Sequence, residues 1–488
     1  FTKTGTSGQN IKYDPGDFNP SSWDISNARI DIFLKPNYGN YLFNVSSIDG
    51  AANTITYVSN RGAGVDNRYY FQNIFQVLDV KNEWFYDKNT KMLYFYPGHT
   101  LTASDEISIP FTINTISVKG AKYIEFKGIS VEETAGRHPY DKENYGNCVY
   151  IKNSENIILD GCKISNSETN GVFIGDSMNI TVKNSEIFEN GRGGVYMKDS
   201  VNYFKQLINT KYLITGNTFH DNGAVEIGSG EGGSGVLSTT VGSVISYNHV
   251  YNEPRIGIML YAANDNIIEY NNVHDINLKT EDTGSIYTIS ENCAQRGHII
   301  RNNYIKGSGG LGVSGGKIFT PNYSWGIYLD NGADGMRIQG NTIVDTYRGA
   351  VYVNGGGNNI IENNTFVENR TRQQILFGSR GDTTCWDFLQ NFGSQGYNTS
   401  LYYQRYPELS KYKPNMTKTE FASTNQIVNN KFIYPTKDIS LYAAGSLDLP
   451  SAKINNNTIW QGIKPINPGI STNSWNNWKG MGFDNLSV

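Results

Sequence analysis

Two aspartates and one glutamate adjoin glycine-started strands of alternating apolar residues, where their carboxyl groups could take part in acid–base chemistry. Asp282 precedes Gly284 in the phrase Thr-Glu-Asp-Thr-Gly, and Asp330 ends the phrase Gly-Ile-Tyr-Leu-Asp. Two carboxyl groups across a cleft, one protonated and one ionised, are the minimum for hydrolysis of a glycosidic bond. Glu226 follows a third glycine phrase and is a further candidate acid. Against this interpretation, aspartate before glycine is common in turns, and Asp330 could simply pair with Asn354.

Aromatic side chains recur at matching positions of these strands, where they could stack against sugar rings. Alternate residues of a strand point to the same side. Aligning the phrases gives one outward column of Phe173, Tyr196, Glu226, Met259, Tyr287, Tyr328 and Tyr352, and a second of Gly175, Lys198, Gly228, Tyr261, Ile289, Asp330 and Asn354. The residues that alternate with these two columns point inward and form the predicted core. They are Val172, Ile174, Val195, Met197, Val225, Ile227, Ile258, Leu260, Ile327, Leu329, Val351 and Val353. Acids flanked by rings suit a polysaccharide cleft. The predicted substrate-binding residues on this face are Glu226, Tyr261, Tyr287, Tyr328 and Tyr352.

Charged residues near the same rungs add two substrate-binding candidates. Glu281 adjoins Asp282 and is predicted to face solvent or accept a sugar hydroxyl, and Arg296 is a candidate sugar ligand. Further basic residues in this region are Arg255, Lys317 and Arg348. The sequence has no metal-ligand spacing, phosphate-binding glycine loop or nucleophile elbow, so we predict neither a metal nor a cofactor.

A second repeated phrase, Asn-x-apolar, indicates which elements must position these side chains. It occurs at Asn217, Asn248, Asn271, Asn303, Asn341 and Asn364, and the spacing is 23 residues in two cases. Such a period means stacked coils, because one unit cannot bury its own apolar face. Short period-two segments broken by glycine and asparagine are strands. The sequence therefore predicts an all-β chain, a right-handed parallel β-helix, whose asparagines share one corner on successive rungs.

A region without the repeat precedes the predicted solenoid. Residues 1–115 are predicted to form a β-rich flanking or capping subdomain, and residues 116–488 the β-helix. Insertions are expected near 204–212, 228–241 and 307–324, and a longer excursion, whose pattern allows a helix, at about 370–424. The two glycine-rich insertions, 228–241 and 307–324, are predicted to border the face that carries Tyr287 and Tyr328.

Composition excludes several classes of partner. The net charge of −4 comes without a basic stripe, so we expect no nucleic-acid partner. No run approaches the roughly eighteen apolar residues of a membrane span. We expect a monomer, secreted or on the cell surface, whose partner is a polysaccharide or oligosaccharide. A chain that starts at Phe1 is expected to be processed or a fragment, and its four cysteines are compatible with free thiols or disulfides.

Several phrases together resemble a known group of proteins. They are Asn82-Glu-Trp-Phe-Tyr-Asp, Leu93-Tyr-Phe-Tyr-Pro, Asn264-Asp-Asn-Ile-Ile-Glu-Tyr-Asn, Thr280-Glu-Asp-Thr-Gly-Ser-Ile-Tyr, Arg296-Gly-His-Ile-Ile-Arg-Asn-Asn, Gly326-Ile-Tyr-Leu-Asp-Asn-Gly-Ala-Asp-Gly and Arg405-Tyr-Pro-Glu-Leu. From about residue 80 to 432, the chain resembles bacterial right-handed parallel β-helix proteins related to glycoside hydrolase family 141, which are α-L-fucosidases or xylanases. The resemblance implies a secreted glycosidase that cleaves a plant or microbial cell-wall polysaccharide. It places the family's paired catalytic aspartates at Asp282 and Asp330.

The chain departs from that family at two places. Relatives usually follow the Ile-Tyr of the Asp282 phrase with Gly-Arg-Asp-Trp, whereas here Thr288-Ile-Ser-Glu-Asn-Cys follows. Relatives also have a second aspartate after the one at Asp330, and this chain has Asn331. The loop that would shape the sugar subsite therefore differs, and the resemblance does not carry the substrate over.

Two other functions fit the same sequence. A polysaccharide lyase on this fold would need a neutralising cation held by clustered acids and a basic residue such as Arg255, Arg296 or Lys317. A non-catalytic carbohydrate-binding or structural β-helix would need neither aspartate.

For hydrolysis, the two acids must reach one glycosidic bond. Since they are displaced along neighbouring strands, a bend at Gly284 must bring them together. Hydrolysis with retention and hydrolysis with inversion of the anomeric configuration both stay open.

Overall fold

The chain folds into two units, and we describe each by itself. The structure, a computed structural model, describes residues 9–59, 61–135, 146–225, 227, 232–290, 294–369, 373–378, 393–412, 417, 420, 423–435, 440–443, 453–461, 468 and 474–484. The first unit comprises the residues up to Pro110 together with Leu311–Thr320, and the second comprises the stacked strands that follow Pro110.

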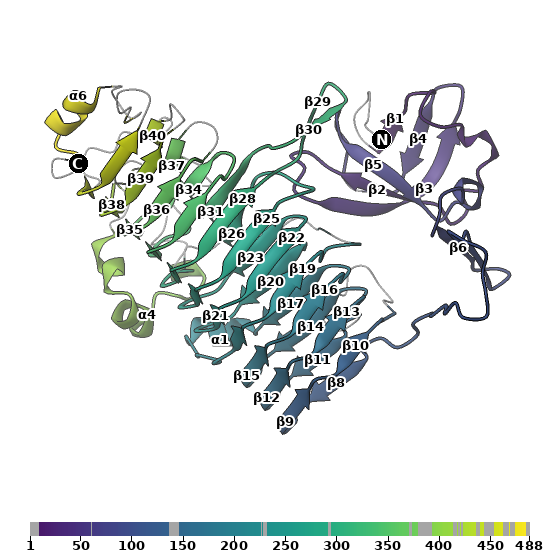
Figure 1. Ribbon diagram of the computed structural model, residues 1–488, viewed down its shortest axis with the longest axis horizontal. Coiled ribbons are helices and arrows are strands. Elements are labelled where there is room, and N and C mark those ends of the chain that lie inside the picture. The colour runs from purple at the N-terminus through teal and green to yellow at the C-terminus, as the bar shows by residue number, and fades with distance from the viewer. Residues whose placement is uncertain are drawn as a thin grey trace. The chain divides into compact units, whose positions relative to one another are not determined.

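The second unit consists of three parallel sheets of 11 strands each, through which the chain winds coil after coil (Figure 1). Sheet 1 contains β8 (Ile116–Lys119), β11 (Val149–Lys152), β14 (Asn170–Gly175), β17 (Gly193–Lys198), β20 (Ser234–Thr239), β23 (Ile256–Tyr261), β26 (Thr283–Ile289), β31 (Ser324–Asp330), β34 (Gly349–Asn354), β37 (Gln373–Gly378) and β40 (Ser440–Ala443). Sheet 2 contains β9 (Lys122–Lys127), β12 (Glu155–Asp160), β15 (Met178–Lys183), β18 (Leu213–Thr215), β21 (Val244–Ser246), β24 (Ile267–Glu269), β27 (Ile299–Arg301), β32 (Arg337–Gln339), β35 (Ile360–Glu362), β38 (Gln426–Val428) and β41 (Lys453–Asn455). Sheet 3 contains β10 (Ser130–Glu132), β13 (Lys163–Ser165), β16 (Glu186–Phe188), β19 (Thr218–His220), β22 (His249–Glu253), β25 (Asn272–Ile276), β28 (Tyr304–Ser308), β33 (Thr342–Val344), β36 (Thr365–Val367), β39 (Lys431–Tyr434) and β42 (Thr458–Gln461). The predicted parallel β-helix is confirmed.

A buried ladder of asparagines lies between sheets 2 and 3. The side-chain amide of each donates to the carboxamide oxygen of the next, at 2.9–3.1 Å, through Asn217, Asn248, Asn271, Asn303, Asn341, Asn364, Asn430 and Asn457. The second amide hydrogen goes to a backbone carbonyl, as from Asn271 to Ile245 O at 2.9 Å. All six predicted asparagines share this corner, so the predicted ladder is confirmed. It continues for two further rungs.

The inward positions of sheet 1 fill the core, except at one rung. The predicted core residues on β14, β17, β23, β31 and β34 are buried in one continuous cluster, which also holds the free thiols of Cys148 and Cys162. The prediction is wrong for Val225, which is 41% exposed, whereas Ile227 is buried but lies outside this cluster. β20 instead begins after the next glycine-rich stretch, and its Val236 pairs with Val195 in the core. The chain therefore uses the phrase Gly235-Val-Leu-Ser for this rung, and part of the predicted insertion 228–241 is strand.

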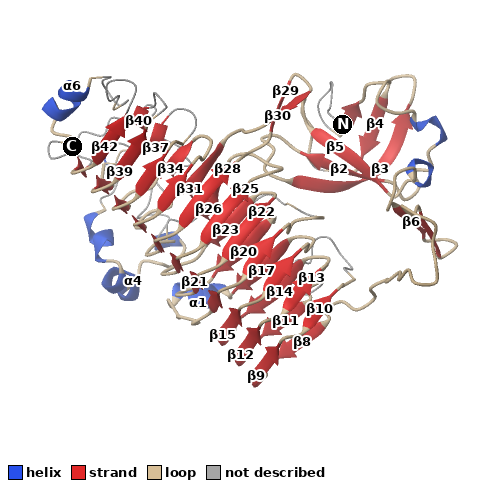
Figure 2. Ribbon diagram, viewed as in Figure 1, coloured by secondary structure: helices blue, strands red, loops and turns tan. Residues whose placement is uncertain are grey.

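Short helices lie outside the stacked strands (Figure 2). They are α1 (Val201–Lys205), α4 (Ser400–Arg405), the 3-10 helix η3 (Pro407–Lys411) and α6 (Trp475–Gly480). α4 and η3 belong to the long excursion and, through Tyr402 and Leu409, form an apolar cluster with Phe204 of α1. No helix in the described part of the chain is long and apolar enough to cross a bilayer.

The first unit is built on an antiparallel sheet in the order β1-β4-β3-β2-β5. Its elements are β1 (Asn10–Lys12), the 3-10 helix η1 (Pro20–Ser22), β2 (Arg29–Phe33), β3 (Asn40–Asp49), β4 (Thr54–Tyr57), β5 (Arg68–Gln72), the 3-10 helix η2 (Phe75–Val77) and the hairpin β6 (Trp84–Asp87)–β7 (Met92–Phe95). The hairpin β29 (Gly312–Ser314)–β30 (Lys317–Phe319), from the predicted insertion 307–324, also belongs to this unit. Asp66 accepts hydrogen bonds from the backbone N–H groups of Gly315 and Gly316 at its turn.

Removing one amide from the asparagine ladder should destabilise the β-helix. In Asn271→Ala, the backbone N–H and side-chain amide of Asn248 lose the oxygen to which both now donate at 3.0 Å. Since each buried unsatisfied group costs about 1–3 kcal/mol, we expect at least ~2 kcal/mol of lost stability, measured by urea unfolding. The neighbouring exposed Asn272 provides the control, and Asn272→Ala should unfold at nearly the wild-type urea concentration. Equal midpoints for the two variants would contradict this role for the ladder.

A second buried ladder contains an acid. Asn190 donates to Asn222 at 2.9 Å, and Asn222 donates to Glu253 Oε1 at 2.8 Å. Glu253 is fully buried, and desolvation raises its pKa from 4.5 to about 8. The carboxyl group is therefore protonated in the folded protein at neutral pH. This proton binding stabilises the fold below pH 4.5, and the stabilisation is lost as pH rises towards 8.

Glu253→Gln should remove this pH dependence, because an uncharged amide takes the place of the protonated acid. We expect the wild-type free energy of unfolding to fall between pH 5 and 8, by roughly 1.4 kcal/mol for each unit by which the folded pKa exceeds the unfolded one. The variant should show a flatter curve in urea titrations at several pH values. A wild-type curve that rises over this range would contradict the assignment.

Candidate active site

The carboxylate of Asp330, at the end of β31, accepts four hydrogen bonds. Tyr287 OH donates to Oδ2 at 2.6 Å, and Tyr328 OH donates to Oδ1 at 3.1 Å. Oδ1 also accepts from Asn354 Nδ2 and from the backbone N–H of Asn331, both at 2.8 Å. Asp330 is 3% exposed. Donors on both oxygens suit an ionised carboxylate, which can only accept hydrogen bonds.

The strand register of sheet 1 brings these groups together. Tyr287, Tyr328 and Tyr352 pair across β26, β31 and β34, as the outward column predicts. The rings of Tyr328 and Tyr352 stack at 4.5 Å, and that of Tyr287 meets Tyr328 edge-on at 5.2 Å. Asp330 lies two residues beyond Tyr328, on the same side of the sheet. A tyrosine on the adjoining strand can therefore reach its carboxylate diagonally.

Asp282 lies in the turn that leads into β26. Its backbone is in the left-handed conformation (φ 57°), and its N–H donates to Tyr323 O at 2.7 Å. Burial first, then the Asp330 carboxylate, raises the pKa of Tyr328 well above its usual value, and Asp282 adds to this effect. Burial, and after it both aspartates, also raise the pKa of Tyr287 and of the half-buried Tyr323. The two predicted acids therefore act on one group of three tyrosines.

Basic and aromatic groups complete the cluster. Arg255 is 3% exposed, and its Nη1 donates a hydrogen bond to the backbone oxygen of Glu281 at 3.4 Å. Its positive charge opposes the increase in the pKa of Tyr287. The Glu281 carboxylate accepts from Asn322. Next to them, the Arg348 guanidinium lies over the ring of Tyr323 at 4.3 Å. The predicted Glu281 thus lies beside the site, and the two arginines bring positive charge to it.

Two aromatic residues of this cluster are absent from the predicted site. The buried Trp325 stacks on Tyr352 at 4.5 Å, and Tyr323 contacts Trp325 edge-on at 4.7 Å. Both precede Gly326, the first residue of the repeated phrase, so aligning the phrases does not include them. Extending the register backwards from the glycine to Trp325, which pairs with Gly284 on β26, could have found them.

The other predicted binding residues have different positions. Tyr261, half-buried, packs at the margin of the same aromatic cluster. Glu226 lies outside the described residues, and the position in the outward column beside Tyr196 is occupied by Leu237. The tip of the 307–324 insertion, with Lys317, belongs to the first unit.

Arg296 belongs to a different cluster, which contradicts its predicted role in binding sugar. Its fully buried guanidinium donates to Asp334 at 2.6 Å and to Glu408 of η3 at 3.2 Å. Tyr412 also donates to Asp334. Burial raises the pKa of Asp334 to about 6, although the Arg296 charge opposes this. The ion pair between Arg296 and Glu408 attaches the long excursion to the β-helix. It could not be predicted from the sequence because Glu408 lies 112 residues after Arg296.

Comparisons with known proteins agree with the fold. A family model described as a right-handed β-helix region matches residues 18–206 and 147–322. No curated protein sequence matches the chain. Similar solved structures include a glycoside hydrolase with 14% identity and a TM-score of 0.52, over 70% of this chain and 67% of that one. A periplasmic alginate epimerase has 13% identity and a TM-score of 0.43, covering 72% and 75% of the two chains. The catalytic domain of a family 87 α-1,3-glucanase in complex with nigerose has 11% identity and a TM-score of 0.41, covering 95% and 90%. At 14% identity, the similarity to the first of these structures shows the fold alone.

Replacing Arg296 should destabilise the protein because it leaves the Asp334 carboxylate buried without its cation. For Arg296→Ala we expect a loss of about 3–5 kcal/mol in urea unfolding. The control is Arg301→Ala, which removes a half-exposed arginine that pairs with Glu269 on the surface and should cost less than about 1 kcal/mol. Similar stability of the two variants would contradict the structural role of Arg296.

Proposed function

The chain belongs to the right-handed β-helix family, and on this fold we propose that the Asp330 cluster is the active site of a glycoside hydrolase that cleaves a polysaccharide. The observation that carries the proposal is the Asp330 carboxylate, buried on the outward side of sheet 1 and held by four donors, with Asp282 acting on the same tyrosines. A carboxylate fixed in one orientation beside a second acid is the arrangement that glycosidic hydrolysis uses.

The two aspartates have different surroundings, which supports different roles for them. Asp330, held as an acceptor, acts as the nucleophile or as the base that activates water. The hydrogen bonds from Tyr287 and Asn354 orient it towards the sugar carbon. Asp282, in a partly buried turn, donates its proton to the leaving oxygen. This division requires one protonated and one ionised carboxyl group, as acid–base cleavage does.

Around the two acids, the half-buried Tyr261 and Tyr323 offer ring surface for sugar stacking, and Arg348 supports the ring of Tyr323. We extend the proposal to a fucoside- or xylan-type linkage in a cell-wall polysaccharide and to a secreted or surface-bound protein. The resemblance of the Asp282 and Asp330 phrases to glycoside hydrolase family 141 motivates this extension, and the loop that departs from the family makes the linkage the part that needs testing.

Substrates with different leaving groups should separate the two roles. Asp282→Asn should lower turnover of xylan or fucosylated oligosaccharides by a factor of about 10²–10⁴, as expected for loss of a general acid. It should lower turnover of dinitrophenyl glycosides far less, because that leaving group needs no proton. Asp330→Ala should inactivate the enzyme towards both classes. Product formation is measured as reducing ends or released phenolate.

The matched control for Asp282 is Asp275→Asn, since Asp275 also has a left-handed backbone (φ 53°) but is exposed on sheet 3. This variant should keep wild-type activity. Added azide that restores Asp330→Ala and yields a glycosyl azide would assign Asp330 as a nucleophile if the wild type releases its product with retained anomeric configuration, and as the base if the configuration is inverted. Near-normal hydrolysis by the Asp282→Asn, Asp330→Asn double variant would eliminate the pair, and unsaturated products absorbing in the ultraviolet would identify a lyase instead.

A further inference from the structure

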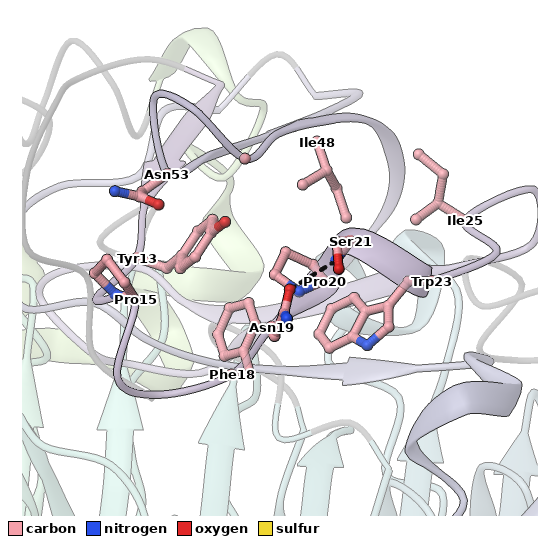
Figure 3. A pocket seen from close by; sticks show the side chains of 11 residues that line it. Tyr13, Pro15, Phe18, Asn19, Pro20, Ser21, Trp23, Ile25, Ile48 and Asn53 are labelled. Carbon is pink, nitrogen blue, oxygen red and sulfur yellow. Dashed lines mark hydrogen bonds between the residues drawn. The ribbon is translucent and has the colours of Figure 1, made fainter.

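The first unit contains a cavity of about 640 Å³ that takes no part in the proposed active site (Figure 3). Its lining is aromatic, aliphatic and amide in character, and consists of Tyr13, Pro15, Phe18, Asn19, Pro20, Ser21, Trp23, Ile25, Ile48, Gly50 and Asn53. All of these residues come from the turn between β1 and β2 and from the β3–β4 hairpin. The cavity therefore lies wholly within the first unit.

Three rings form a row along this cavity. Tyr13 and Phe18 stack with centroids 4.7 Å apart, and Phe18 and Trp23 stack at 5.1 Å. Such centroid separations are those of offset stacking, in which each ring leaves part of its neighbour's face uncovered. The edge of Phe71 on β5 supports Phe18 and Trp23 at 5.4 and 5.0 Å. The row is thus held by the core of the unit, while Phe18 and Trp23 stay only partly buried.

Hydrogen bonds between residues two apart in sequence hold the turns of the segment that carries the rings. Asp14 Oδ1 accepts from Gly16 N at 3.0 Å, Asn19 Oδ1 caps η1 by accepting from Ser21 N at 3.1 Å, and Asp24 Oδ1 accepts from Ser26 N at 3.0 Å. A wall fixed in this way loses little conformational entropy when a ligand binds. The cavity is therefore pre-organised.

The polar groups of the lining indicate the chemistry of the ligand. Asn19, Ser21 and Asn53 supply amide and hydroxyl groups, and the lining contains no Lys, Arg, Asp or Glu. Asn53 holds a left-handed backbone (φ 51°) at the β3–β4 turn, and its amide lies at the edge of the cavity across from Phe18 (Figure 3). An uncharged ligand with one apolar face and several hydroxyls satisfies both the rings and the amides, whereas a lipid would leave the amides unsatisfied.

We propose that this cavity is an accessory binding site for an uncharged sugar unit of the polysaccharide substrate. The sugar ring lies on the accessible parts of Phe18 and Trp23, with the buried Tyr13 stacked behind Phe18, and its hydroxyls bond to the amide of Asn53 and the hydroxyl of Ser21. The identity of the ligand as substrate rests on the proposed function. The site itself binds glycan whether or not Asp282 and Asp330 perform hydrolysis.

Affinity electrophoresis of the full chain tests the proposal, with Asp282→Asn and Asp330→Asn present in every sample to prevent cleavage. Gels contain arabinoxylan or xyloglucan as neutral probes and polygalacturonate as a charged probe. We expect the neutral probes to retard the protein and Trp23→Ala to weaken binding at least tenfold. Because Trp23→Ala removes a ring from the packed row, Asn53→Gly provides a second variant that keeps the left-handed backbone, and we expect it to weaken binding two- to tenfold.

The matched control is Asn73→Gly, since Asn73 has the same left-handed backbone (φ 59°) in the same unit but does not line the cavity. It should bind like the parent. Equal retardation of the parent and Asn53→Gly, absence of retardation by both neutral probes, or retardation by polygalacturonate alone would overturn the proposal. With the aspartates restored, Asn53→Gly should hydrolyse dinitrophenyl glycosides at the wild-type rate. Absence of hydrolysis by the wild-type protein would instead contradict the proposed function and would leave the result of the binding experiment unchanged.

Discussion

Stacking of buried asparagine amides at one corner constrains the rest of the β-helix. Each amide of the ladder donates to the oxygen of the next asparagine and to a backbone carbonyl, so a coil that slipped by one residue would leave polar groups unsatisfied. Such a slip would also turn the core residues of each strand outward. The ladder between sheets 2 and 3 thus fixes the register of the coils from Asn217 to Asn457, including their strands that carry no asparagine.

That register is what allows the candidate active site to form from side chains on separate coils. Tyr287 and Tyr328 pair on neighbouring strands, and Asp330 follows two residues later on the same side. Since rungs are about 4.8 Å apart, a long tyrosine side chain on β26 reaches a short aspartate on β31. A shift of one residue in either coil would turn one partner into the core. The site therefore depends on hydrogen bonds at a corner to which none of its own residues belongs.

The features that recur with the period could be predicted from the sequence, and those made by unique long-range contacts could not. The asparagine corner, the tyrosine column and Asp330 follow from periodicity alone. At the β20 rung the sequence offers two glycine phrases, and the chain uses the later one, which places Val236 in the core and Leu237 in the outward column. The partner of Arg296, Glu408, lies more than a hundred residues away, in an excursion without a repeat.

The surroundings of two buried aspartates explain why Asp330 is suited to catalysis and Asp334 to a structural ion pair. Asp334 meets a guanidinium, so its charge is neutralised inside the protein and the pair has little left to offer a substrate. Asp330 receives hydrogen bonds from two phenols, an amide and a backbone N–H. Neutral donors stabilise a carboxylate without cancelling its charge, which leaves it able to attack a sugar carbon or to take a proton from water. The same residue type, on the same rung, thus serves two purposes because different neighbours come to it.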